Sequence, residues 1–136
     1  MKKKIAMGLA VMITALLTGC GNPTMPLAEV FSQEQLEQQT KQIVEWLNAE
    51  EYEQVYETFR EDMKEVLPTE ELKAACEETY GNGGAFAQIN DTEVSGQKIE
   101  GEDYAVVRVK AQYEKQIVTF QVGYDANMEV VGLYMK

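Results

Sequence analysis

Histidine is absent from the 136 residues of the chain. Because neutral imidazole is the commonest metal ligand and the usual general base near neutral pH, this absence excludes Ser-His, Cys-His and His-metal arrangements. Serine is scarce as well: Ser32 precedes a predicted helix, and Ser95 stands before a glycine in a turn or bulge. We therefore expect no catalytic residue of these classes, no metal site and no cofactor.

Cations are few, with 12 Lys and Arg against 23 Asp and Glu, which gives a formal net charge of −11. Nucleic-acid binding needs a basic surface, so nucleic acid is not an expected partner. The same balance argues against electrostatic adhesion to anionic lipid. A high negative charge is typical of a protein that stays soluble.

No apolar run reaches the ~20 residues that a membrane-spanning helix needs. The longest, residues 5–17, follows Lys2, Lys3 and Lys4, which is the pattern of a secretory signal peptide. The run ends in Leu17-Thr18-Gly19-Cys20, which resembles the lipobox of bacterial lipoproteins. The resemblance implies cleavage after Gly19 and a diacylglyceryl thioether on Cys20. We expect residues 1–19 to be a signal peptide and the protein to be lipid-anchored on the extracytoplasmic face of the cell membrane; an ordinary signal peptide with a chance cysteine remains the alternative.

Cysteine is limited to two residues. If Cys20 is acylated, Cys76 has no disulfide partner, and its place on the apolar stripe of a predicted helix favours a small buried side chain over a reactive thiol. Residues 20–31 contain Pro23 and Pro26 without periodicity, which predicts a lipidated tether. Residues 32–136 then suit a single domain.

Three helices are predicted in the first half of this domain, over residues 32–48, 49–67 and 69–80. Ser32, Asn48 and Thr69 are placed as N-caps, and Gln35 stands at the capping-box position after Ser32. Pro68 ends the second helix. Helical spacing predicts these buried positions: Leu36, Thr40, Ile43, Val44, Leu47, Tyr52, Val55, Tyr56, Phe59, Met63, Leu72, Cys76 and Tyr80.

The hydrophobic period changes to two after Gly84, which predicts four strands. The first covers residues 86–98 with an imperfect, bulged alternation. Turns at residues 101–103, 114–116 and 125–127 separate the others. The last strand places Val131, Leu133 and Met135 in alternation. Three helices followed by such a meander predict an α+β fold, in which the helices pack on the apolar face of one curved, four-stranded antiparallel sheet.

Several short motifs of the chain resemble domain of unknown function 3887, over about residues 33–136. They are Leu47-Asn48, Tyr52, Phe59, Glu71-Leu72, Gly84-Ala85-Phe86 and Val131-Gly132-Leu133-Tyr134. The resemblance implies a cone-like fold similar to nuclear transport factor two and to cystatin, and a lipoprotein of a Gram-positive bacterium. That family has no assigned catalytic residues, so none is transferred.

Acidic residues are abundant but fall on polar helix faces, at helix starts or in turns, where a solvated surface explains them. Residues 125–129 resemble the start of a calcium loop, yet Val130 stands where that loop requires glycine. A hairpin turn is therefore the prediction for this segment.

Tyrosines on the predicted core faces offer the remaining chemistry. Tyr113 and Tyr124 are our candidates for ligand binding at the mouth of the cone, with simple core packing as the alternative. No acid falls on the predicted inward strand faces. We therefore predict a non-enzymatic module that binds an unknown small molecule or envelope protein. The alternatives are a small isomerase or dehydratase that uses a Tyr and a carboxylate in the cone, and a structural accessory domain of a larger envelope complex. An inward acid beside a Tyr would favour the enzyme.

Overall fold

The computed structural model describes residues 25–136, so the predicted signal peptide and Cys20 lie outside the described part. Helices come first and strands second, as the sequence predicts. The helices are α2 (Gln33–Asn48), α3 (Tyr52–Glu57), α4 (Glu61–Val66) and α5 (Thr69–Tyr80). The strands are β1 (Phe86–Ile99), β2 (Glu102–Tyr113), β3 (Ile117–Tyr124) and β4 (Val130–Met135). The α+β fold class is confirmed.

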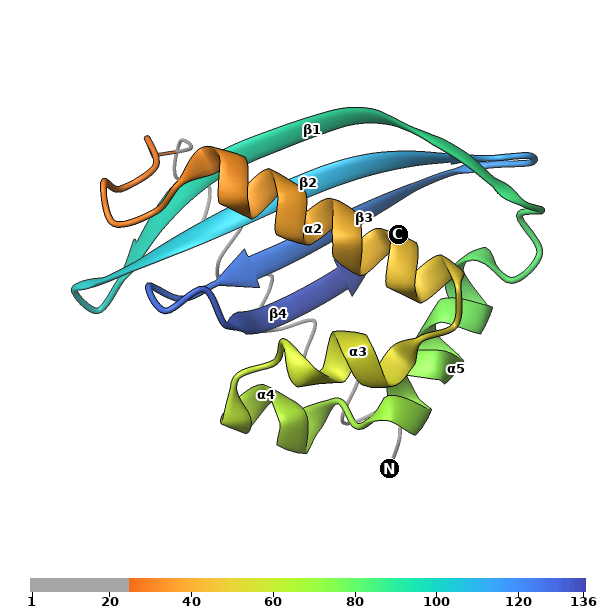
Figure 1. Cartoon of the computed structure of the whole chain (residues 1–136), viewed down its shortest axis with the longest axis horizontal. Coiled ribbons are helices and arrows are strands. Elements are labelled where there is room, and N and C mark those ends of the chain that lie inside the picture. Colours follow the sequence, from red (N-terminus) through yellow and green to blue (C-terminus); the bar gives the residue numbers. More distant parts are fainter. Residues whose placement is uncertain (1–24) are drawn as a thin grey trace.

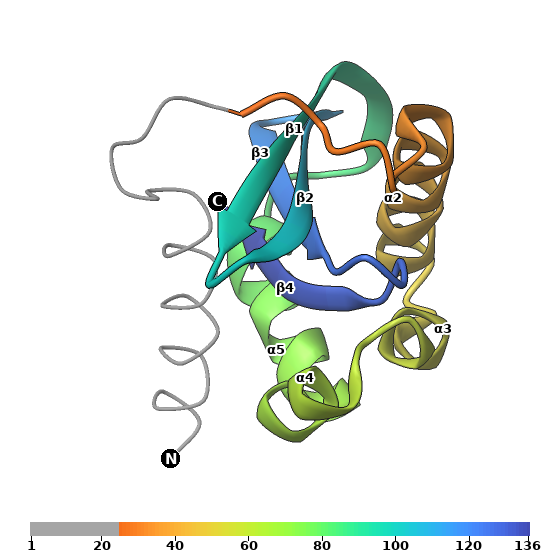
Figure 2. The ribbon, with the colours of Figure 1, turned by 90° about the vertical axis from the view of Figure 1, so that its left-hand side faces the viewer.

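A curved antiparallel sheet of order β1-β2-β3-β4 forms one layer, and the helices form the other. Helix α2 runs along the concave side of the sheet, while α3, α4 and α5 lie beyond β4 and close one end (Figures 1 and 2). One large hydrophobic core fills the space between the two layers. It includes Leu36, Ile43, Val44, Leu47, Val55, Met63, Leu72, Val107, Val109, Phe120, Val122 and Leu133.

Helix α2 begins where its capping signal predicts. The Ser32 hydroxyl accepts a hydrogen bond from the Gln35 amide at 3.3 Å. The buried face of the helix is the predicted stripe, including Thr40, whose hydroxyl donates to the Leu36 carbonyl at 2.8 Å. Cys76 is buried on α5, which confirms its predicted role in packing.

The predicted single helix over residues 49–67 is wrong, because α3 and α4 are separate. Between them, the Arg60 amide donates to the Val130 carbonyl at 2.8 Å, and the Val130 amide donates to the Thr58 carbonyl at 2.9 Å. Phe59 thereby forms a parallel bridge with Val130 and is buried. These bonds to β4 replace the helical bonds that the break removes.

Two predicted N-caps are also wrong. Asn48 is the last residue of α2 rather than the cap of the next helix, and α3 starts only at Tyr52. Thr69 is already the first residue of α5, whose N-cap is Pro68. The chain turns between α2 and α3 through Glu50, which has a left-handed φ of 61°.

The sheet register follows the predicted alternation except in two irregular regions, one in β1 and one between β3 and β4. The first strand is bulged between Phe86 and Asp91, as predicted. At the other end, a register shift between Gly123 and Tyr124 places Val130 in the main core and Val131 with Val106 in a second cluster. The predicted alternation of Val131 with Leu133 is therefore wrong.

Residues 25–31, the last part of the predicted tether, contact the domain. The Gly96 amide in β1 donates to the Met25 carbonyl at 2.8 Å, and Met25 bridges Gly96 in antiparallel fashion. Phe31 is buried in the main core, and Leu27 and Ala28 pack against it. The folded part of the chain therefore extends beyond Ser32 toward the N-terminus. Along residues 25–136, no helix has the length and apolarity needed to cross a membrane.

Replacing Gly96 with alanine should break the pairing of Met25 with β1. A Cβ at this position would lie 2.3 Å from the Pro26 carbonyl oxygen, so one of the two segments must move. Hydrogen–deuterium exchange should show faster exchange of the amide of residue 96 in the variant, while the β2 and β3 amides keep their protection. Ser95→Ala is the matched control and should change the exchange of none of these amides. If the amide of residue 96 stays protected in Gly96→Ala, the close approach of residue 96 to the Pro26 carbonyl is contradicted.

Candidate functional site

The C-terminal end of α2, helix α5 and the first residues of β1 lie at one end of the molecule (Figure 1). A cleft opens among these elements. Its volume is about 470 Å³, and it is partly open to solvent. We call it the aromatic cleft because four aromatic rings line it. The lining residues are Leu47, Asn48, Glu50, Tyr52, Cys76, Glu77, Tyr80, Gly81, Gly84, Ala85, Phe86 and Tyr113.

Stacked tyrosines form the inner part of the aromatic cleft. The rings of Tyr80 and Tyr113 lie 5.2 Å apart and nearly parallel, and Phe86 meets Tyr113 edge-on at 5.6 Å. The Tyr80 hydroxyl donates to the Leu47 carbonyl at 3.1 Å, which joins α5 to the end of α2. Such pairs hold aromatic rings in fixed positions, so the inner part of the cleft is preformed.

Asn48 provides the polar group of the cleft. Its Oδ1 accepts a hydrogen bond from the Tyr113 hydroxyl at 2.5 Å, while its Nδ2 is buried without a hydrogen-bond partner. The other orientation of the amide would give Tyr113 the Nδ2 atom and leave Oδ1 without a partner. In either orientation one buried polar atom is unpaired, at a cost of about 1–3 kcal/mol that a ligand group can remove.

The hydroxyls around the cleft stay protonated at neutral pH. Burial raises the pKa of Tyr52 and of Tyr113 to about 12 each, and raises the pKa of Tyr80 further. Burial also raises the pKa of the Cys76 thiol to about 11. These groups therefore act as neutral donors, and neither a phenolate nor a thiolate nucleophile is available in the cleft.

The protein should lose stability in alkaline solution as these buried groups ionise. Their pKa values are raised in the folded state, so the unfolded chain releases protons first as the pH increases. The stabilisation is complete below the unfolded pKa values of ~8.5 for Cys and ~10 for Tyr. It is lost progressively as the pH rises through the folded values near 11 and 12. No histidine adds a transition near neutral pH.

Urea unfolding at stepped pH values, with tyrosinate absorbance followed in parallel, measures this loss. Tyr124→Phe should reduce it, because the pKa of Tyr124 is also raised by burial. Native tyrosines that all titrate near pH ~10, as free tyrosine does, would contradict the prediction.

The two tyrosines predicted from the sequence lie in different places. Tyr113 lines the aromatic cleft, although its side chain is only 1% exposed. Tyr124 is 0% exposed, and its hydroxyl shares a 2.6 Å hydrogen bond with Thr40 in the core. Tyr124 does not line the aromatic cleft, so the structure does not bring the two candidates together.

Carboxylates occur at the rim of the aromatic cleft and not inside it. Glu50 and Glu77 are both exposed. Among residues 25–136, Asp125 is the buried acid, and it belongs to a separate network. The combination of an inward acid and a Tyr, which the enzyme alternative requires, is therefore missing from the described part of the cleft.

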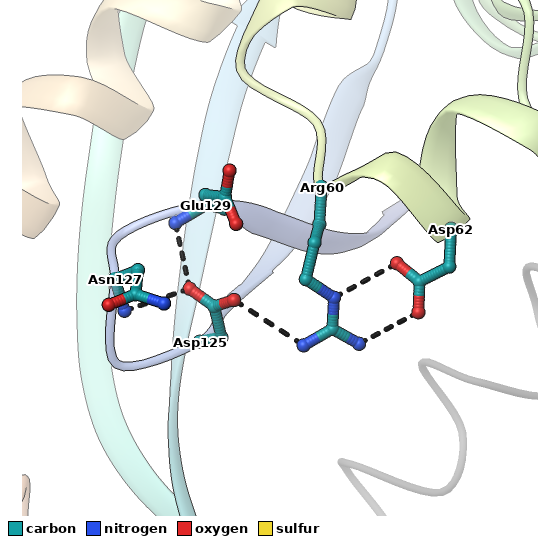
Figure 3. A network of polar contacts seen from close by, with 5 residues as sticks. All are labelled: Arg60, Asp62, Asp125, Asn127 and Glu129. Atoms are coloured by element: carbon teal, nitrogen blue, oxygen red, sulfur yellow. Dashed lines mark hydrogen bonds and ion pairs between the residues drawn. The ribbon is translucent and has the colours of Figure 1, made fainter.

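Asp125 organises the turn between β3 and β4 (Figure 3). Its Oδ1 accepts hydrogen bonds from the Asn127 and Glu129 amides at 2.9 Å each, and its Oδ2 pairs with Arg60 at 3.4 Å. Arg60 also binds Asp62 through two hydrogen bonds of 2.9 Å, which lower the pKa of Asp62. The predicted hairpin turn is confirmed, and residues 25–136 contain no cluster of acidic or thiol side chains that would hold a metal ion.

Sequence analysis missed Asn48, Tyr52 and Phe86 as cleft residues. Asn48 carried a capping signal that explained it locally, and Tyr52 and Phe86 matched the apolar patterns of a helix and a strand. Only the packing of α2, α3 and the start of β1 makes these residues neighbours. The motif Leu47-Asn48 was the one available signal, since it marks a polar residue at the end of an apolar stripe.

Comparison with known proteins supports the fold. An NMR structure of a protein from Ruminococcus gnavus ATCC 29149 is similar to this chain, with a TM-score of 0.71 and 23% sequence identity. The similarity covers 82% of this chain and 97% of that one. No match is found among curated proteins. Residues 40–133 match the family described as "Protein of unknown function (DUF3887)", and the chain therefore belongs to this family.

Proposed function

We propose that this protein is a lipoprotein anchored by Cys20 at the extracytoplasmic face of the membrane, and that its domain is a non-enzymatic binding module. We further propose that the aromatic cleft is its binding site. The observation that carries the proposal is the unpaired amide atom of Asn48 among aromatic rings, in a cleft of about 470 Å³. Ligand sites are typically apolar hollows of this size with a few fixed polar groups.

The chemistry of the cleft favours binding over catalysis. Its hydroxyls are neutral donors, because the pKa values of Tyr52 and Tyr113 are raised to about 12. Its carboxylates are exposed at the rim, where water solvates them. Catalysis of the isomerase type depends on a carboxyl group kept in an apolar site, so the enzyme remains the alternative with less support.

A pair of alanine-to-tryptophan substitutions tests the site. Ala85 is exposed and lines the cleft, while Ala87 is exposed two residues further along β1 and does not. We expect ligand-observed NMR with a panel of neutral, cationic and anionic organic compounds to find ligands of the full-length protein. Ala85→Trp should abolish their binding, and Ala87→Trp should leave it unchanged.

Three results would argue against the proposed function. Equal binding in the two tryptophan variants would place the site elsewhere. Turnover of a panel compound that depends on Glu50 or Glu77 would favour the enzyme. For the anchor, Cys20→Ala should abolish labelling by a fatty-acid probe, and continued labelling would exclude a lipid on Cys20.

A further inference from the structure

We infer that the aromatic cleft selects a small organic cation that also carries a hydrogen-bond acceptor. This inference rests on the proposed function and specifies the ligand class of the same site. It combines three properties of the cleft: the sign of its charge, its aromatic lining and its unpaired amide.

The charges around the cleft are negative. Glu50 and Glu77 are its ionisable carboxylates, and no Lys or Arg lines it. An adjoining hollow of about 440 Å³ shares Glu50 and Tyr52 with the cleft. That hollow adds three acids and one base, namely Glu51, Glu53, Glu70 and Lys73. The local potential therefore attracts a cation and repels an anion.

The lining suits a cation of low hydration. Tyr52, Tyr80 and Phe86 are the partly exposed rings of the lining, and the negative face of an aromatic ring attracts organic ammonium groups. Because the tyrosine hydroxyls remain protonated, the rim carboxylates are the anionic partners at neutral pH. For a cation bound between the rings and the carboxylates, these groups compensate the charge and replace part of the hydration shell.

The Asn48 amide is the reason why we expect the ligand to carry a hydrogen-bond acceptor. The Tyr113 hydroxyl donates to Oδ1 of Asn48, and Nδ2 of Asn48 remains a donor without an acceptor. Nδ2 is buried, so a carbonyl or ester oxygen of the ligand would accept from it after a small shift of the side chains that cover it. The ligand then has two polar ends, with its acceptor at Asn48 and its cation near the rim.

Glu50 occupies a backbone position that favours glycine. Its φ is 61°. Two backbone hydrogen bonds end α2 at this point: the Glu50 amide donates to the Leu47 carbonyl, and the Glu51 amide donates to the Trp46 carbonyl. Glycine adopts this conformation without steric cost, whereas other residues are strained. Replacing Glu50 with glycine should therefore relieve strain while it removes a rim carboxylate.

Three matched probes test the ligand class. Acetylcholine is a cation with an ester acceptor, 3,3-dimethylbutyl acetate is its neutral isostere, and pentyltrimethylammonium is a cation without the acceptor. Binding to the full-length protein in non-ionic detergent is measured from amide chemical shifts of cleft residues, with empty micelles as the blank. Acetylcholine should bind at least about tenfold more tightly than either other probe, and less tightly as salt increases.

Variants separate the cation site from general binding. Glu50→Gln and Glu77→Gln should each weaken acetylcholine binding about three- to tenfold and leave the neutral isostere unchanged. Glu78→Gln, an exposed neighbour that does not line the cleft, is the control and should change neither. Glu50→Gly should raise the melting temperature while weakening acetylcholine binding, which a purely structural role of Glu50 does not explain.

The outcomes distinguish this inference from the proposed function. If the neutral isostere binds as tightly as acetylcholine and Ala85→Trp removes both, the ligand class is wrong and the binding site stands. If pentyltrimethylammonium equals acetylcholine, the acceptor at Asn48 is wrong. If no probe shifts a cleft resonance, the inference is overturned, and the wider compound panel decides the proposed function.

Discussion

Replacing Phe120 with alanine should lower the free energy of unfolding by about 3–5 kcal/mol. Phe120 is 0% exposed in the middle of β3, where it pairs with Val109 on β2 and Met135 on β4. Its ring also packs against Tyr80 at 6.0 Å. Removing it opens a cavity that both layers border and that neither can close easily. Urea unfolding monitored by circular dichroism measures the change.

Thr119→Ala is the control for Phe120→Ala. Thr119 precedes Phe120 on the same strand, points to the other face of the sheet and is only partly buried. Its loss should change stability by less than about 1 kcal/mol. Comparable losses in the two variants would show that the register of β3 differs from the one described here.

Asp125→Ala should cost about 3 kcal/mol, because the carboxylate has three partners and little contact with water. It accepts from two backbone amides of the β3–β4 turn and pairs with Arg60, while remaining only 7% exposed. Without it, the turn loses its internal acceptor and Arg60 loses one of its two acidic partners. Denaturant unfolding gives the loss, and amide exchange at Asn127 and Glu129 should show where it arises.

Asp103→Ala is the matched comparison for Asp125→Ala. Asp103 also pairs with a cation, Lys98, at 3.5 Å, but both side chains are well exposed to solvent. Exposed ion pairs contribute ~0–1 kcal/mol, so the variant should be nearly as stable as the native chain. A loss equal to that of Asp125→Ala would mean that the hydrogen bonds of the turn contribute little.

Local signals predicted the parts of the fold that depend on local interactions. Helices α2 and α5 follow from their apolar spacing, and the Ser32 cap follows from residues within one turn. The strands follow from alternation because one face of the sheet is buried. The order of helices before strands was then enough to give the fold class.

Long-range pairing explains the errors. The break between α3 and α4 depends on hydrogen bonds from residues 58–60 to Val130, and no neighbouring residue signals it. The position of Val131 depends on a shift between Gly123 and Tyr124 against β4. The helix break and the register shift both depend on hydrogen bonds to a distant strand, so the residue pattern within one segment cannot predict them.

Local patterns predicted on which side of the sheet the two candidate tyrosines lie, but not which of them lines the aromatic cleft. Strand alternation places Tyr113 and Tyr124 on the same side of the sheet, and both hydroxyls do find partners. Which tyrosine lies beside an opening depends on where α2 ends: Thr40 covers Tyr124, whereas Asn48 is the last residue of the helix.

If the proposed lipid on Cys20 is present, the pairing of Met25 with Gly96 limits how far the domain can stand from a bilayer. Counted from a lipid on Cys20, five residue steps reach Met25, which is at most about 17 Å of extended chain. Helix α2 has 16 residues and therefore extends about 24 Å from near this attachment point toward the aromatic cleft (Figure 1). Under the proposed anchor, this end of the domain would lie close to the lipid headgroups, and the aromatic cleft would face solutes outside the membrane rather than molecules embedded in it.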